Sequence, residues 1–334
     1  MNPILSIAVV NFNYGRYLED AIRSVFDQIP EAGFEVGGLK FDVELVVVDG
    51  GSTDNSVDVI KKYAKELPPG IHAKDFLATS NAKHQTSNLT FWLSEKDRGQ
   101  SDAFNKAFAH CRGKYLTWLN ADDIMPKGCL AKIVKELAAH PDCEWFTGNM
   151  FRFCEVSELV GDGVSGLEDE GHPINAITHK PNNRFNIVEA PWGPNCLPSF
   201  LQGKGMPIAV YGPATIFTKR IFDAAGGMKL HQNFMMDTDL WMRFVMMGVR
   251  QRRINTFCWA FRMHVDSKTA EFGDHKLSPE QRAKFEVERK ASMEATGYKP
   301  NALNRRLIQL WRIFDGSILK AWWLKRRLKS YCGY

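Results

Sequence analysis

Short apolar runs alternate with amphipathic stretches through the first 140 residues of the chain. Residues 4–10 and 43–48 are apolar runs of strand length, and each precedes a segment with apolar residues at helical spacing. The same order recurs at residues 89–93 and 114–119, again before helical patterns. Such alternation predicts an α/β domain with a Rossmann-like, mostly parallel central sheet and flanking helices.

The alternation stops after residue 144. Residues 155–213 are rich in Gly, Pro, Asn and charge and match no regular element, which is typical of a lid or acceptor loop. Strand and helix patterns resume at 214–218, 219–225, 238–247 and 250–257. We therefore expect one α/β domain over residues 1–265 and a helical C-terminal extension over residues 266–334.

Composition is that of an ordinary globular protein. Hydrophobic residues make up 44% and charged residues 24% of the chain. No run of about 18 apolar residues predicts a membrane-spanning helix, and the first residues do not resemble a signal peptide. The seven Cys residues lack CxxC spacing, which favours a reducing compartment over a disulfide framework or a zinc site.

Positive charge is concentrated at the C-terminus. Residues 301–334 contain eight Lys or Arg and one Asp, a balance of +7, so the rest of the chain sums to −2 within the total of +5. Apolar residues recur there every three or four positions, with Trp residues among the basic ones. This pattern predicts an amphipathic helix on an anionic membrane surface. The alternative is a helix packed on the protein body or at a homo-oligomer interface. The near-neutral body argues against a nucleic-acid partner.

Residues 114–123, KYLTWLNADD, carry the clearest chemical signal. An apolar run ends in Asn120-Ala121-Asp122-Asp123, so a buried strand presents two carboxylates at its carboxyl end. In open α/β sheets this end faces the ligand crevice. Two adjacent carboxylates without a neighbouring Lys or Arg favour Mg²⁺ or Mn²⁺, shared with substrate phosphates. The alternative is that they cap the helix predicted from about Lys127.

Five segments, in the order of the predicted elements, resemble the family 2 glycosyltransferases, inverting enzymes of the GT-A fold. They are VVNFNYGRYLEDAIRSVFDQ, ELVVVDGGSTDNSVDVI, SEKDRGQSDAFNKAF, GKYLTWLNADD and GPATIFTKRIFDAAGG…MMDTDLWMRF. The resemblance covers about residues 4–150 and 210–265. It implies transfer of a sugar from a nucleotide-diphosphate donor, with UDP expected, to a hydroxyl of a glycan or lipid-linked acceptor. The type implied is that of bacterial surface-polysaccharide assembly.

The resemblance also implies a nucleotide-binding set. Phe12 matches the position that stacks on the base, although an aromatic residue at a strand end is also common in cores. Asp49 is expected to contact base or ribose; many relatives have a second acidic residue next, where this chain has Gly50. Asp102 suits a nucleotide contact and support of the helix dipole equally, and residues 52–54 are expected to cap a helix. The nucleotide-sugar set comprises Val10, Phe12, Asp49, Arg98, Asp102, Asn120, Ala121 and His264.

Metal and catalytic positions follow from the same resemblance. Asp122 is implied as the main ligand of Mn²⁺ or Mg²⁺, with Asp123 as a second metal residue or in support. Asp237 matches the catalytic base, with Asp239 as the fallback, although both also suit a helix N-terminus. His264 lies where relatives close over the diphosphate and is expected to contact phosphate or metal. A lone His is equally often structural.

Other classes of protein predict different sequences. A nucleotide-binding oxidoreductase or epimerase would carry G-x-G-x-x-G after the first strand, where this chain has Asn-Phe-Asn-Tyr-Gly-Arg. A glycoside hydrolase needs a carboxylate pair but neither a nucleotide site nor a metal. The alternative that stays open is an inactive glycan- or nucleotide-sugar-binding protein on the same fold, which predicts loss of Asp122 or Asp237. We expect a cytoplasmic transferase, peripheral on the cytosolic face of the cell membrane.

Overall fold

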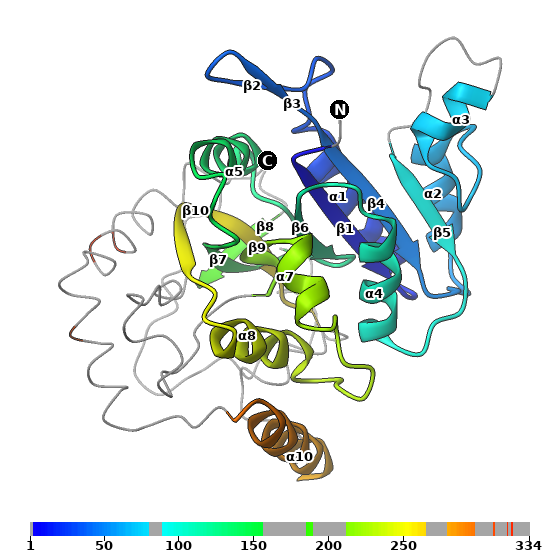
Figure 1. Ribbon diagram of the computed structural model, residues 1–334. Coiled ribbons are helices and arrows are strands. Elements are labelled where there is room, and N and C mark those ends of the chain that lie inside the picture. Colours follow the sequence, from blue (N-terminus) through cyan, green and yellow to red (C-terminus); the bar gives the residue numbers. More distant parts are fainter. Residues whose placement is uncertain are drawn as a thin grey trace.

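The computed structural model describes residues 3–79, 89–155, 185–189, 212–264 and 279–297, with single residues at 310, 319 and 322. Most of the predicted irregular section 155–213 and of the predicted basic tail lies outside these residues. Within them, no helix is both long and apolar enough to cross a membrane. The strands and helices form layers around one large sheet (Figure 1).

The N-terminal part follows the predicted alternation. Its main elements are β1 (Leu5–Asn11), α1 (Gly15–Phe26), β4 (Val43–Asp49), α2 (Ser56–Ala64), β5 (Phe91–Ser94), α4 (Gln100–His110), β6 (Tyr115–Asn120) and α5 (Cys129–Ala139). Each predicted strand and helix of this part is confirmed. The pattern did not predict three short elements, β2 (Phe34–Val36), β3 (Leu39–Phe41) and α3 (Ala73–Thr79), because so few residues show no clear period.

The C-terminal part contains β7 (Trp145–Glu155), β8 (Phe185–Glu189), η1 (Gly212–Ala214), β9 (Thr215–Thr218), α7 (Lys219–Ala224), α8 (Met236–Met246), β10 (Gln251–Arg262) and α10 (Pro279–Thr296). The sequence did not predict β7. Its eleven residues include buried Thr147 and Asn149 among aromatic side chains. Polar residues buried inside the sheet interrupt the apolar run that would have indicated a strand.

The sheet has the strand order β10-β7-β9-β6-β1-β4-β5, and β8 pairs with β7. Strands β6, β1, β4 and β5 are parallel, whereas β9 is antiparallel to both β6 and β7. The register pairs Val10 of β1 with Val48 and with Asn120. The three central strands therefore end at the same level, and the mostly parallel GT-A sheet predicted from the sequence is confirmed.

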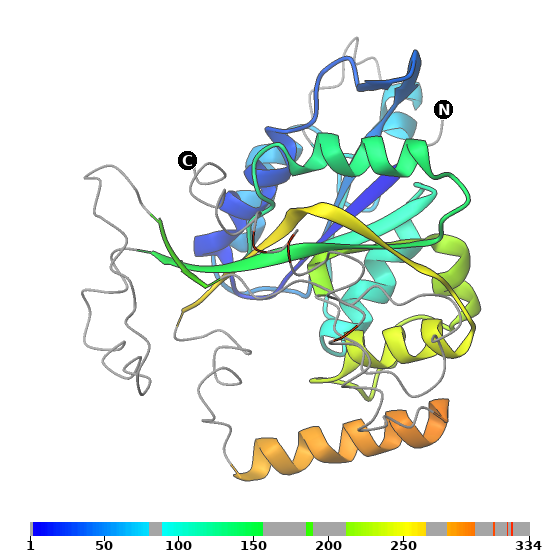
Figure 2. The same cartoon turned by 90° about the vertical axis from the view of Figure 1, so that its left-hand side faces the viewer.

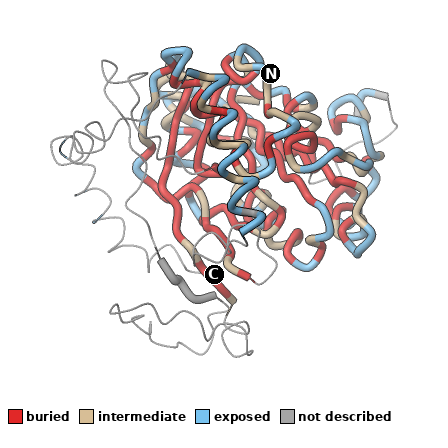
Figure 3. The backbone as a smooth tube through the Cα atoms, turned by 90° about the horizontal axis from the view of Figure 1, so that it is seen from below, coloured by how far each residue is buried: buried red, intermediate tan, exposed pale blue. Residues whose placement is uncertain are grey.

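Helices cover both faces of the sheet (Figure 2). Ile7 and Val9 face a cluster with α1, α2 and α5, whereas Ala8 and Val10 face a cluster with α4, α7 and α8. The alternating side chains of β1 are thus buried on both sides, as a parallel sheet between helical layers requires. Figure 3 shows the buried strands inside the more exposed helices.

The C-terminal helix α10 packs on α8 (Figures 1 and 2). Met235 and Met242 form a small apolar cluster with Phe285 and Met293 of α10. The described helix of the predicted C-terminal extension therefore contacts the α/β body.

Candidate active site

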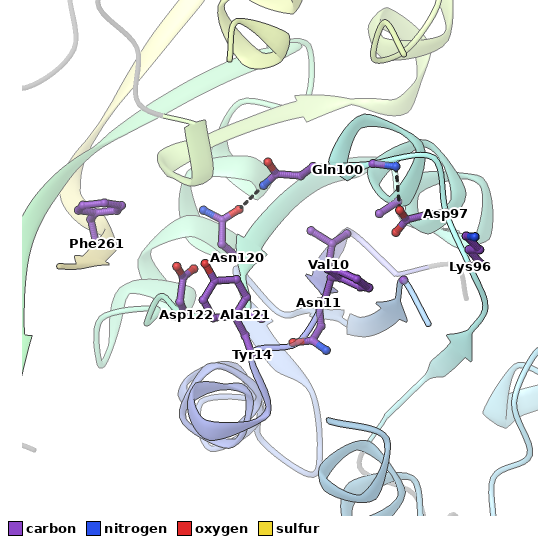
Figure 4. A pocket seen from close by; sticks show the side chains of 14 residues that line it. Val10, Asn11, Tyr14, Lys96, Asp97, Gln100, Asn120, Ala121, Asp122 and Phe261 are labelled. Carbon is purple, nitrogen blue, oxygen red and sulfur yellow. Dashed lines mark hydrogen bonds between the residues drawn. The ribbon is translucent and has the colours of Figure 1, made fainter. Parts of the chain in front are cut away.

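A cavity of about 510 Å³ opens at the carboxyl ends of β1, β4 and β6. Its lining comes from within residues 10–14, 96–103 and 120–122, together with Gly50 and Phe261. Figure 4 shows Asp122 and Phe261 toward one end and Lys96 and Asp97 toward the other. This is the place where open α/β sheets bind their ligands.

Five residues of the predicted nucleotide and metal sets line this cavity: Val10, Phe12, Asn120, Ala121 and Asp122. Phe12 follows the last residue of β1, and 56% of its surface is exposed. The ring is therefore not a core residue, which removes the alternative left open for it. An exposed aromatic face at a cavity is suited to stack on a planar base.

Asp49 holds the surrounding loops together. Its buried carboxylate accepts hydrogen bonds from Asn11 Nδ2 and Ser94 Oγ, both at 2.7 Å, and from the Ser52 N–H at 3.0 Å. These donors lie on β1, on β5 and in the loop after β4. Asp49 does not line the cavity. Its hydrogen bonds join three segments around the cavity, and its contact with base or ribose stays a prediction.

Asp54 joins the first residues of two helices. Its Oδ2 accepts a hydrogen bond from the Gly15 N–H at 2.9 Å, and its Oδ1 accepts one from the Ser56 N–H at 3.0 Å. Gly15 begins α1 and Ser56 begins α2, so one carboxylate satisfies free donors of both helices. The predicted capping role of residues 52–54 is confirmed for Asp54.

Arg98 and Asp102 pair with each other. Arg98 Nη2 lies 2.8 Å from Asp102 Oδ1, and the Arg98 backbone N–H donates to Asp102 Oδ2 at 3.1 Å. The hydrogen bond from Arg98 lowers the pKa of the Asp102 carboxyl. Neither residue lines the cavity. Of the two roles open for Asp102, support of the first turn of α4 is the one that its contacts favour.

Asp122 faces His264. Its Oδ2 lies 3.1 Å from His264 Nε2, and the imidazole is fully buried against the rings of Tyr17 and Tyr14, at centroid distances of 4.6 and 5.7 Å. His264 Nδ1 is buried without a hydrogen-bond partner among the described residues. The sequence placed these two residues 142 positions apart, and the fold brings them into contact.

Asp123 faces the interior. Its fully buried carboxylate accepts hydrogen bonds from Asn120 Nδ2 at 2.8 Å and from the Arg262 N–H at 2.9 Å. Burial, followed by repulsion from Asp122, raises the pKa of the Asp123 carboxyl. Of the two carboxylates only Asp122 lines the cavity, and the contacts of Asp123 fit the supporting position that was its predicted alternative. Neither carboxylate caps α5, which begins at Cys129, so that alternative is wrong.

Arg262 is a residue that the sequence analysis did not assign. Its guanidinium is fully buried and pairs with Asp20 Oδ2 at 2.9 Å and with Glu155 Oε1, while its Nε donates to the Asp122 carbonyl oxygen at 2.7 Å. It also lies between the rings of Tyr17 and Phe153. Its carboxylate partners are 242 and 107 residues away in sequence, so no local spacing could have indicated this role.

The two candidates for the base have different surroundings. Both lie in the first turn of α8. Asp239 is buried, and its carboxylate binds Arg243 Nη2 at 2.6 Å and Nε at 2.9 Å. Asp237 is half-buried, and its Oδ1 accepts the Thr238 N–H at 2.6 Å. Neither lines the cavity, and Asp239 is held in a buried ion pair with Arg243.

The sequence is similar to those of glycosyltransferases. Residues 6–151, less than half of the chain, match the family described as glycosyl transferase family 2. An uncharacterized glycosyltransferase of Nostoc sp. is 33% identical over 131 residues, 39% of this chain and 32% of that protein. TuaG of Bacillus subtilis, named for glycosyl transfer in teichuronic acid biosynthesis, is 25% identical over 54% of each chain. The chain thus spans between about a third and about half of the length of these relatives.

Solved structures agree on the fold. Residues 1–349 of TarS from S. aureus superpose with a TM-score of 0.51 at 13% identity, covering 98% of this chain and 91% of that one. The same fragment in complex with UDP-GlcNAc gives a TM-score of 0.50 at 14% identity, covering 80% and 60% of the two chains. The family match thus covers residues 6–151, and the likeness to the solved structures shows that the chain shares their fold, which is the GT-A fold predicted from the sequence.

Proposed function

We propose that this protein is an inverting glycosyltransferase that moves a sugar from a nucleotide-diphosphate donor, UDP being the expected nucleotide, to an acceptor hydroxyl. The observation that carries the proposal is the cavity at the strand ends. It combines the exposed ring of Phe12 with the carboxylate of Asp122, backed by His264. An aromatic face suits the base, and oxygen and imidazole ligands suit a cation that accompanies a diphosphate.

The donor is held by the residues that follow the strand ends and line the cavity. In the proposed complex the base stacks on Phe12, and the diphosphate extends toward Asp122. Helix α4 begins at Gln100 beside the cavity, so its free backbone N–H groups favour the anionic part of the donor. Binding across these groups orients the anomeric carbon for attack, and such orientation supplies much of the rate acceleration of a two-substrate reaction.

Asp122 and His264 fit a divalent cation such as Mn²⁺ or Mg²⁺. A carboxylate oxygen and a buried imidazole nitrogen already lie 3.1 Å apart, with no basic side chain between them. Within the described ranges no three His, Cys, Asp or Glu residues gather at one point, so donor oxygens and water would complete the coordination. When bound, such an ion neutralises charge on the leaving diphosphate.

Asp237 removes the proton of the acceptor hydroxyl in this proposal. Its Oδ1 accepts a hydrogen bond from the Thr238 N–H at 2.6 Å, which holds the side chain in the first turn of α8. The fallback Asp239 is less suited, because its carboxylate is buried in the ion pair with Arg243. A half-buried carboxylate in the first turn of a helix is suited to take a proton from an acceptor hydroxyl.

Support for the donor and acceptor classes comes from the relatives. TarS was solved with UDP-GlcNAc, and TuaG is named for assembly of a cell-wall polymer. A glycan or lipid-linked acceptor on the cytosolic face of the membrane is consistent with these names and with the +7 balance of residues 301–334.

Full-length protein should therefore sediment with phosphatidylglycerol vesicles, and a chain that ends at residue 300 should not. Equal sedimentation of the two would contradict the membrane role.

The transferase proposal is tested by turnover. Purified protein is incubated with UDP-, GDP- and dTDP-sugars, with Mn²⁺ or with a chelator, and release of nucleoside diphosphate is measured. We expect release from one donor class, dependent on the metal and increased by a suitable glycan acceptor. Stable binding of the donors without any release, with or without acceptors, would identify an inactive nucleotide-sugar-binding protein instead.

A further inference from the structure

Gly50 leaves a gap in the cavity wall, and Asp97 fills it. A Cβ atom added at Gly50 would overlap Asp97 Oδ2, and would lie 3.1 Å from Asp97 Cγ and 3.4 Å from Phe12 Cδ2. Gly50 follows β4, whereas Asp97 belongs to the loop between β5 and α4. The carboxylate of Asp97 therefore occupies the space in which a side chain of residue 50 would stand, next to the exposed ring of Phe12.

The two oxygens of Asp97 have different surroundings. Oδ1 accepts a hydrogen bond from the Gly99 N–H at 2.8 Å, which fixes the side chain in the loop before α4. Oδ2 is the atom nearest to the Gly50 position, and it has no hydrogen bond to any described residue. Asp97, Gly50 and Phe12 all line the cavity, and Figure 4 shows Asp97 at the end away from Asp122.

We propose that Asp97 is the residue that recognises the base of the donor, through a hydrogen bond from an imide N–H to Oδ2. This assignment rests on the proposed transferase function, because it assumes that a base stacks on Phe12. A base on that ring has its edge beside the Gly50 gap. The carboxylate at this position can only accept hydrogen bonds.

The chemistry of the position selects a class of base. One free carboxylate oxygen suits the single N–H between two carbonyl groups of uracil or thymine. Guanine offers two adjacent N–H donors, which would need both oxygens of the Asp97 carboxylate. One of these oxygens, Oδ1, already accepts the hydrogen bond from Gly99. Cytosine and adenine place a ring nitrogen acceptor beside their amino group, and that acceptor would face the carboxylate without a proton between them. The position therefore favours uridine or thymidine diphosphate donors.

The assignment is tested by moving the carboxylate from residue 97 to residue 50. The backbone of Gly50 is not in the left-handed region, so an Asp side chain is sterically allowed there once Asp97 is shortened to Ala. Affinities for UDP and for N3-methyl-UDP are measured by calorimetry with Mn²⁺ in wild type, Asp97→Ala, Gly50→Asp and the double variant. Asp97→Ala should bind UDP about 10- to 100-fold more weakly, the usual worth of a hydrogen bond to a charged group. Wild type should prefer UDP over N3-methyl-UDP by a similar factor, and Asp97→Ala should lose that preference.

The other variants act as controls. Gly50→Asp alone should weaken UDP binding, because its side chain overlaps the Asp97 carboxylate. The double variant should recover most of the wild-type affinity and preference. Glu95→Ala removes a nearby carboxylate that pairs with Lys106 outside the cavity and should leave both affinities unchanged. Thermal unfolding of each variant confirms that the protein is folded at the temperature of measurement.

Several outcomes would overturn the assignment. One is UDP binding that Asp97→Ala leaves unchanged. Another is an equal loss of affinity for UDP and for N3-methyl-UDP in Asp97→Ala, because this would indicate a contact away from the imide. If the double variant bound UDP as weakly as Asp97→Ala, a carboxylate in the space shared by residues 50 and 97 would not be what recognises the base. Wild type that binds no nucleoside diphosphate at all would instead overturn the proposed transferase function.

Discussion

On the donor side of the site, the residues that line the cavity follow directly from the ends of β1, β4 and β6. On the side of the candidate catalytic base, formed by α8, β10 and α10, the carboxylates of Asp237 and Asp239 are bound by the nearby Thr238 and Arg243. The segments that position them are held by residues far away in the sequence. Arg262 of β10 reaches Asp20 and Glu155, and Glu288 of α10 reaches the loop before α8. The first side is therefore readable from local motifs, and the second depends on the assembled fold.

The loop before α8 illustrates this dependence. The Glu288 carboxylate accepts hydrogen bonds from the N–H groups of Asn233 at 3.0 Å, Phe234 at 2.8 Å and Met235 at 3.2 Å. On the other side of the loop, Ser101 Oγ of α4 donates to the Gln232 carbonyl oxygen at 2.9 Å. The segment that leads to the candidate base is thus held between the donor side and the C-terminal helix.

The largest expected effect tests which carboxylate of α8 takes part in chemistry. Asp237→Asn should bind donor normally and lose transfer by about two to four orders of magnitude, the usual contribution of a positioned base. Asp239→Asn should instead lower stability, because it weakens the buried pair with Arg243, and should leave turnover of the folded protein close to wild type. Steady-state kinetics at saturating donor checks both. The reverse profile would assign the base to Asp239.

The next effect tests whether Arg262 joins the two sides. Arg262→Leu leaves the carboxylates of Asp20 and Glu155 without their buried cation and should cost about 3–5 kcal/mol of unfolding free energy. Chemical denaturation provides the measurement. The matched control is Arg23→Leu, which removes an exposed pair with Asp27 and should cost less than about 1 kcal/mol. Similar costs for the two variants would mean that the Arg262 network contributes no more than a surface pair.

Stabilisation of the protein by nucleotide and Mn²⁺ should depend on Asp122. UDP with Mn²⁺ at about 100 times its Kd should stabilise wild type by about 2.7 kcal/mol. Asp122→Ala should lose this Mn²⁺-dependent increment while keeping its fold, because it removes the only carboxylate of the acidic pair that lines the cavity. Thermal shift with Mn²⁺ and with chelator measures the difference. An unchanged increment in Asp122→Ala would remove the metal assignment.

The smallest effect tests the contribution of α10. Glu288→Gln replaces charged acceptors of three backbone N–H groups by one neutral acceptor and should cost about 1–2 kcal/mol of stability. Amide hydrogen exchange of residues 233–235 should become faster, because these groups lose their partner. Glu286→Gln on the same helix breaks only an exposed pair with Arg289 and serves as the control. Equal exchange rates in the two variants would show that Glu288 does not hold the loop.

The sequence by itself determined the alternation of strands and helices, which follows from hydrophobic period, and the position of Asn120 and Asp122 at the end of a strand. Val10 and Phe12 were expected at the site from the resemblance to family 2 glycosyltransferases, and the common level at which β1, β4 and β6 end is set by the register of the sheet. Burial could not be predicted in the same way. Asp49, Asp102 and Asp123 all lie next to cavity residues or strand ends, yet each carboxylate is directed to protein donors.

Only the tertiary structure decided which of two neighbouring carboxylates meets the ligand. Asp122 and Asp123 are equivalent in sequence, and the Arg262 backbone N–H 139 residues away satisfies one of them and leaves the other beside His264. Likewise, the Gly50 gap has meaning only because another loop places Asp97 in it. Hydrophobic patterns fix elements because period is a local property. Hydrogen-bond partners of buried charges are settled by the packing of distant segments, where leaving such a group unpaired costs several kcal/mol.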